Sequence, residues 1–211
     1  MKRTSLAILS TLLMMASTTF AATGATNTNT VSPTLQISAT VQSAVQLTLS
    51  TGTNLAGTSC AISAGGNPPD YLMSFGNVDA MAINPVTCGA KYPASGLSNA
   101  VYYTDYQVTP TFSGQANNTA SGSIKAYVSL NSMPSSVTVV RDSANTGTNP
   151  VDATQFTAMP TTLATAYSIA TGPLTTGTAL HPFIGVAIST ANGAGTTGAG
   201  TATITYVLTV Q

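Results

Sequence analysis

Strict alternation of apolar and polar residues near the N-terminus is the strongest structural signal in this chain. Between Leu35 and Leu49 every odd position except Ser43 is apolar, and every even position is polar or small. A period of two is typical of a β-strand with one buried face and one solvent-exposed face. At about 3.3 Å per residue the segment would span roughly 50 Å, against roughly 17–20 Å for an ordinary strand.

Two interpretations of this long segment are open. It is either two consecutive strands of a self-contained sandwich, bent near Ser43 and Ala44, or a strand that serves two separate sheets. An exposed amphipathic segment near a terminus is what strand exchange between subunits requires. Polymerisation rather than catalysis is therefore the leading hypothesis.

The first 21 residues, MKRTSLAILSTLLMMASTTFA, have the three parts of a secretory signal peptide. Lys2 and Arg3 form the positive region, and a short apolar run follows. Thr19 and Ala21 supply the small residues that precede the cleavage site. No later run approaches the roughly 20 apolar residues of a transmembrane helix. We therefore expect export, no direct membrane insertion, and three parts: signal peptide 1–21, N-terminal extension 22–42 and β-sandwich domain 43–211.

The mature chain carries few charges. Without residues 1–21, three cationic side chains stand against five Asp and no Glu, which gives a net charge of −2. A basic surface of the kind that binds nucleic acid or anionic lipid is missing from this composition. Weak repulsion between copies suits a subunit that associates.

Cys60 and Cys88 are the two cysteines of the chain. In an exported protein such a pair most simply forms one disulfide. A closed loop of about 29 residues would stabilise the fold by roughly 3–4 kcal/mol. A two-thiolate metal site needs further ligands, and nothing marks His181, the single histidine, as one. We predict a disulfide, and no metal or cofactor.

Short alternating segments separated by turn residues continue to the end of the chain and predict an all-β, antiparallel β-sandwich. Residues 100–112 are expected to form a strand pair or one bent strand, because Pro110 interrupts them. Residues 183–189 and 201–210 are expected to pair as a hairpin. Two sets of apolar residues each share one strand face: Ile124, Ala126, Val128 and Leu130, and at the C-terminus Ile204, Tyr206, Leu208 and Val210.

In this order the features resemble those of the spore coat protein U family, the subunits of archaic chaperone–usher pili. The resemblance rests on the signal peptide, the alternating LQISATVQSAVQLTL, the cysteine in TSCAIS, the aromatic-glycine turn in YLMSFGNVD and the final strand GTATITYVLTV. These motifs are short, but together they extend over most of the mature chain.

The resemblance implies an immunoglobulin-like sandwich that lacks one strand and is completed by a donor strand from a neighbouring subunit. It implies a pilin that passes through the periplasm with a chaperone and an outer-membrane usher, and a surface fimbrium for cell adhesion and biofilm formation. The donor residues would be Leu35, Ile37, Ala39 and Val41. The subunit's own first strand would begin with Val45, Leu47 and Leu49.

Three other functions compete with this one. A monomeric secreted sandwich could bind carbohydrate or matrix through its loops, with Tyr102, Tyr103 and Tyr106 as candidate aromatic faces. An oxygen-rich loop formed by Asp142, Asn145, Asn149 and Asp152 could hold calcium, although its spacing does not fit an EF-hand and such residues also serve turns. An enzyme is not expected, because His181 has no accompanying GxSxG elbow and the aspartates are scattered.

Overall fold

The structure is a computed structural model that describes residues 36, 44–55, 58–66, 69–94, 99–113, 118–190 and 198–211. The strands belong to one compact unit, residues 42–211. In the described part of the chain, no helix has the length and apolar character needed to cross a membrane. The four predicted donor residues, Leu35, Ile37, Ala39 and Val41, lie outside the described residues.

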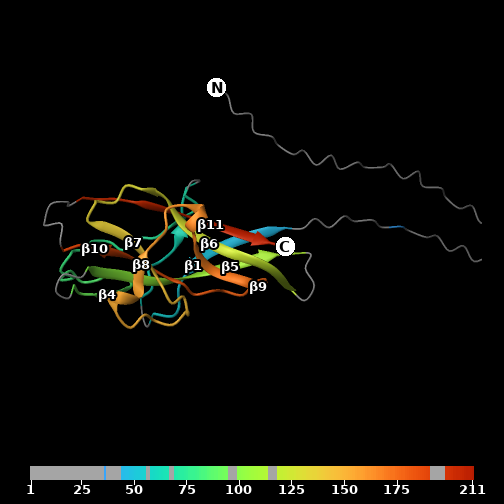
Figure 1. Cartoon of the computed structure of the whole chain (residues 1–211), viewed down its shortest axis with the longest axis horizontal. Helices are drawn as coiled ribbons and strands as arrows, with labels where there is room; N and C mark the ends of the chain where they lie inside the picture. The colour runs from blue at the N-terminus through green and yellow to red at the C-terminus, as the bar shows by residue number, and fades with distance from the viewer. Residues whose placement is uncertain are drawn as a thin grey trace, which may run out of the picture. The chain divides into compact units, whose positions relative to one another are not determined.

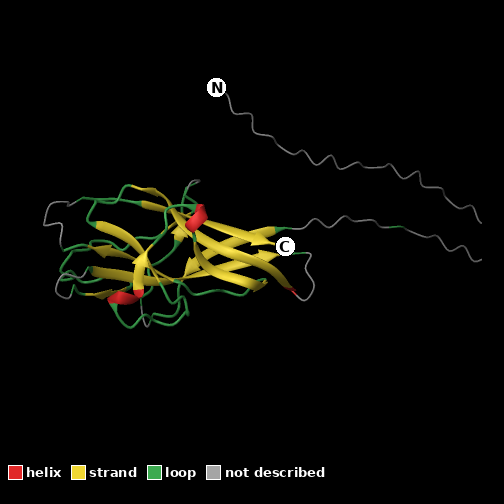
Figure 2. Ribbon diagram, viewed as in Figure 1, coloured by secondary structure: helices red, strands yellow, loops and turns green. Residues whose placement is uncertain are grey.

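Short and long β-strands account for nearly all the regular structure (Figure 2). The strands are β1 (Val45–Thr51), β2 (Ser63–Ala64), β3 (Tyr71–Leu72), β4 (Ala90–Tyr92), β5 (Ala100–Phe112), β6 (Thr119–Asn131), β7 (Val137–Asp142), β8 (Phe156–Ala158), β9 (Tyr167–Thr175), β10 (Phe183–Ile188) and β11 (Ala202–Val210). The single-turn 3-10 helices η2 (Ala153–Gln155) and η3 (Leu163–Thr165) lie before and after β8.

The strands form two main antiparallel sheets (Figure 1). One has the order β1-β5-β10-β7-β8, with β4 also paired to β5, and the other has the order β11-β6-β9. Tyr106 and Val108 of the first sheet share a buried cluster with Ile124 and Ala126 of the second, so the two sheets enclose a common core. The predicted all-β, antiparallel sandwich is confirmed.

The long strand β5 runs past Pro110 without a break, so the prediction that proline divides this segment is wrong. The Pro110 carbonyl accepts the Gly177 N–H at 2.8 Å, on the side of β5 that faces away from β1. Because the N–H and C=O of a strand residue point the same way, the missing donor of Pro110 costs the β1–β5 ladder no hydrogen bond. Strand β1 therefore pairs along the whole of residues 106–112.

Two further predictions fail at the second sheet. Strand β11 pairs with β6, and β10 pairs with β5 and β7, so the last two strands form no hairpin. Leu130 is 70% exposed although Ile124, Ala126 and Val128 are buried. The register shifts between Thr203 and Ile204, whose partners are Leu130 and Val128, and the extra residue turns Leu130 to the outer face.

Candidate functional site

Strand β1 is an edge strand whose inner face is only partly covered. It pairs with β5 on one side and ends the order of its sheet on the other. Leu47 and Leu49 pack against the common core but stay partly exposed, and Val45 is 58% exposed. The expectation that these residues begin the domain's own first strand agrees with the position of β1.

Strand β11 is the corresponding edge of the second sheet. Its core-facing side chains, which include the four predicted from the sequence, are partly buried throughout: Ala202, Ile204, Tyr206, Leu208 and Val210. By contrast, Ile124 and Ala126 on the neighbouring β6 have no exposed surface. The difference arises because β6 has a strand on either side, whereas β11 has one on a single side.

Strands β1 and β11 lie close together although they belong to different sheets (Figure 1). We refer to the core-facing residues of these two strands as the β1–β11 edge. Among the described strands, none pairs with the second side of β1 or of β11, so each presents one row of backbone N–H and C=O groups without a sheet partner there. An edge with free backbone groups and apolar side chains is a template for an added strand.

Other outer strands of the two main sheets are poor templates for strand addition. In the first sheet, β4 and β8 have three residues each. At the far side of the second sheet, β9 contains Gly172, at φ 99°, followed by Pro173. Short strands, kinks and proline are devices by which edge strands avoid pairing with other chains. The β1–β11 edge has none of these devices within its two strands.

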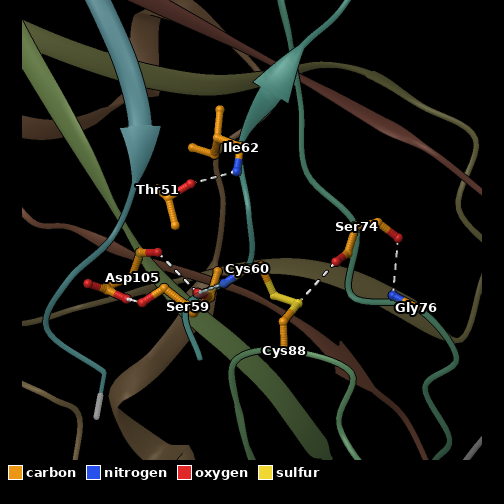
Figure 3. Close-up of a disulfide and its surroundings, with 9 residues drawn as sticks. Thr51, Ser59, Cys60, Ile62, Ser74, Gly76, Cys88 and Asp105 are labelled. Atoms are coloured by element: carbon orange, nitrogen blue, oxygen red, sulfur yellow. Dashed lines mark hydrogen bonds between the residues drawn. A yellow bond between two sulfur atoms is a disulfide. The ribbon is translucent and has the colours of Figure 1, made fainter. Parts of the chain in front are cut away.

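The segment that follows β1 is fixed by a disulfide, as predicted. Cys60 and Cys88 are bonded, with their Cα atoms 4.8 Å apart and 28 positions apart in sequence (Figure 3). Next to the bond, the Cys60 N–H donates to the Thr104 hydroxyl at 2.8 Å, and the Ile62 N–H donates to the Thr51 hydroxyl at 2.9 Å. These contacts tie the end of β1 to the middle of β5.

A buried carboxylate reinforces this attachment. Asp105 of β5 has no exposed surface and accepts a hydrogen bond from the Ser59 hydroxyl (Figure 3). It also accepts one from the Asn54 N–H, at 2.6 Å. A side chain on Gly52 would overlap the Asp105 carboxylate, so the close passage of the chain requires glycine there. Nothing in the sequence alone indicates a role for Asp105 or Gly52, because their contact joins segments 53 residues apart.

Tyrosine side chains line the core beneath the β1–β11 edge. The rings of Tyr106 and Tyr206 meet edge to face, with centroids 6.1 Å apart. Tyr167 lies under the guanidinium of Arg141, whose Cζ is 4.2 Å from the ring centroid. Burial raises the pKa of Tyr206 to about 12, and burial holds the pKa of Tyr106 well above its ordinary value.

These tyrosines predict alkaline destabilisation. A tyrosine in the unfolded chain ionises near pH 10, whereas Tyr206 in the folded chain ionises near pH 12. The stabilisation from its neutral form is complete below pH 10 and is lost as the pH rises to about 12, at about 1.4 kcal/mol per pH unit. Urea unfolding from pH 8 to 12 should show this fall, and Tyr206→Phe should reduce its slope. A slope unchanged by Tyr206→Phe would contradict the assignment.

The tyrosines suggested by the sequence as sugar-binding faces are buried, and the residues of the suggested calcium loop form hydrogen bonds within the chain. Tyr102, Tyr103 and Tyr106 are each at most 3% exposed, so their rings cannot bind a sugar at the surface. The oxygen-rich loop consists of hydrogen-bonded turns. Asp142 accepts from the Ala144 and Asn145 N–H groups, and Asp152 accepts from Thr154.

Comparisons of the chain with protein-family models, with curated proteins and with solved structures gave no match. The assignment of a function therefore depends on the β1–β11 edge and on the sequence that precedes it.

Proposed function

We propose that this chain is a structural pilus subunit that polymerises by donor-strand exchange into a surface fibre for adhesion and biofilm formation. The observation that carries the proposal is that β1 and β11, in the described part of the chain, each have a sheet partner on one side only and side chains that are only partly buried. The alternating residues 35–41 have the pattern of a strand that would complete this edge. Each large side chain inserted there would contribute roughly 1.5–3 kcal/mol before the entropy of association is subtracted.

Donation to a neighbour is favoured over insertion into the same molecule. Ala44 extends the line of β1, because its carbonyl accepts the Ser113 N–H at 3.1 Å and its N–H donates to the Ser113 hydroxyl. To lie beside its own β1, the segment 35–41 would have to reverse direction through Gln42 and Ser43. Two-residue hairpin loops need positive φ angles and therefore favour Gly, Asn or Asp, none of which is present.

The proposal includes temporary partners. An exposed apolar edge is an aggregation hazard before assembly, so a periplasmic chaperone would cover it until an outer-membrane usher admits the next subunit. The partners at the end of the process are identical or related pilin subunits. The predicted signal peptide supports the export that this route requires.

The first test is a denaturing gel of the mature chain, isolated from cells that carry its export machinery. Donor-strand polymers should give a ladder of bands without heating and a single band after heating, because the inserted strand is held without covalent bonds. Deletion of residues 22–42 should remove the ladder. A control chain that keeps the composition of residues 35–41 but loses the alternation should also give a single band.

A monomer at all concentrations, destabilised by the deletion, would contradict the proposal and favour a self-contained sandwich.

The second candidate function is the binding of carbohydrate or matrix by such a monomer, and one surface depression could serve as its binding site. A depression of about 660 Å³ on the first sheet is lined by Tyr92, Val101, Val140 and Phe156, among others. Aromatic and apolar walls of this kind are common in binding sites.

A further inference from the structure

The depression of about 660 Å³ lies on the face of the first sheet that points away from the second sheet. Its floor consists of Val101 of β5, Ala187 of β10 and Val140 of β7, which are each at most 5% exposed. None of the described residues that line it belongs to β1 or β11. A ligand bound there would therefore be a property of the chain beyond the proposed function.

Aromatic rings held in fixed positions border the depression. Tyr92 of β4 and Phe156 of β8 line it, and both are half-buried. Between them, Tyr103 stacks on Tyr92 with ring centroids 5.1 Å apart and contacts Phe156 at 5.0 Å. The Tyr103 hydroxyl donates to the Tyr92 hydroxyl, which donates to the Pro150 carbonyl. Because both hydroxyls are engaged within the chain, Tyr92 and Phe156 offer a ligand mainly the carbon surface of their rings.

The polar groups of the lining come from three separate segments. They are the Asn99 amide, the Thr138 hydroxyl on β7 and the Asp152 carboxylate at the start of η2, and all three residues are exposed. Together these groups can donate and accept hydrogen bonds. The described lining contains no Lys or Arg, so an anionic ligand would meet a like charge at Asp152 without a compensating cation.

We infer that this depression binds one ring of a neutral sugar. A pyranose carries C–H groups on its ring faces and hydroxyls around its edge. The C–H groups match the carbon surface of Tyr92 and Phe156 and the apolar floor, and the hydroxyls match the three polar groups of the lining. The volume is within the range of roughly 300–1,000 Å³ that is usual for small-molecule sites.

An organic cation is the competing ligand class, because aromatic rings beside a carboxylate can hold a quaternary ammonium group. Such a ligand would use Asp152 and the rings but would leave the Asn99 amide and the Thr138 hydroxyl without a role. A neutral sugar uses all of these groups. The distribution of polar groups over three segments therefore favours the sugar.

The test is a titration of the mature full-length chain, followed by NMR, with glucose, galactose, mannose and N-acetylglucosamine as probes. Sialic acid and choline are the anionic and cationic comparisons. At least one neutral sugar should bind more tightly than either charged probe. Ala158→Phe, at an exposed lining position of β8, should weaken this binding by at least about tenfold by filling the depression. Thr157→Phe places the same ring on the opposite face of β8 and should change it by less than about twofold.

A second pair of variants removes a hydrogen-bonding group without filling space. Thr138→Val keeps the shape of the side chain and should weaken sugar binding by about three- to tenfold. Thr171→Val, the same change at an exposed position of β9 in the second sheet, should leave it unchanged. Circular dichroism identifies the variants that fold, and Thr138→Val decides the test if Ala158→Phe does not.

Three results would overturn the inference: no binding of any neutral sugar, tighter binding of choline or sialic acid, or equal losses in the test and control variants. The heat-sensitive ladder should be the same in Ala158→Phe as in the unmodified chain, because this site is separate from the β1–β11 edge. Loss of the ladder in the unmodified chain would remove the proposed function and leave the sugar site standing.

Discussion

A chain with Ile37→Asp is expected to form no heat-sensitive ladder and to remain a folded, disulfide-bonded monomer. Under the proposed function, Ile37 would enter the core of a neighbour at the β1–β11 edge, where Leu47, Leu49 and Leu208 offer apolar contacts. A carboxylate buried without a partner costs several kcal/mol, and each 1.4 kcal/mol lowers association about tenfold. Polymer should therefore fall below detection on the unheated gel.

The matched control is Gln36→Asp, which adds the same charge one position earlier on the polar face of the alternating segment. This variant should form a ladder close to that of the unmodified chain. Folding of both variants is checked by circular dichroism and by the mobility shift on reduction of Cys60–Cys88. Equal loss of polymer in both variants would show that charge near the terminus, rather than burial of Ile37, controls assembly.

Local periodicity was sufficient to predict individual strands, because the alternation within a strand does not depend on which strands lie beside it. The alternation of Val45, Leu47 and Leu49 predicted β1, and that of Ile204 and Tyr206 predicted β11. The disulfide followed from the count of cysteines in an exported chain. Each of these inferences needs the residue types and their spacing, and no knowledge of which strands are neighbours.

Strand order could not be predicted, because pairing joins residues far apart in sequence. Tyr102 and Tyr103 face opposite sides of β5, and both are buried, because clusters of core residues cover each face of the first sheet. Leu130 continues the apolar alternation of β6 but leaves the core at an irregularity in the β6–β11 pairing. The partial exposure of β11 likewise depends on the strand order, because β11 has a sheet partner on one side only.

The second large effect is expected from Gly52→Ala, which should lower the free energy of unfolding by about 3 kcal/mol. The new Cβ would overlap the three carboxylate atoms of Asp105. Asp105 cannot withdraw without breaking its hydrogen bonds to Asn54 and Ser59 and leaving a buried carboxylate without donors. Overpacking costs typically 1–3 kcal/mol, and loss of a buried hydrogen bond to a charged group adds to it.

The effect can be measured by urea unfolding in the Ile37→Asp background, where polymerisation should not interfere. Gly66→Ala is the matched control, because a Cβ there meets no heavy atom within 4 Å, and it should change stability by less than about 0.5 kcal/mol. Asp105→Ala removes the overlapping atoms, so its cost and that of Gly52→Ala should not add. If the two losses in unfolding free energy were additive, the destabilisation by Gly52→Ala would not arise from contact with Asp105. Non-additive costs would mean that this contact fixes the chain after β1, and with it the strand that forms one side of the β1–β11 edge.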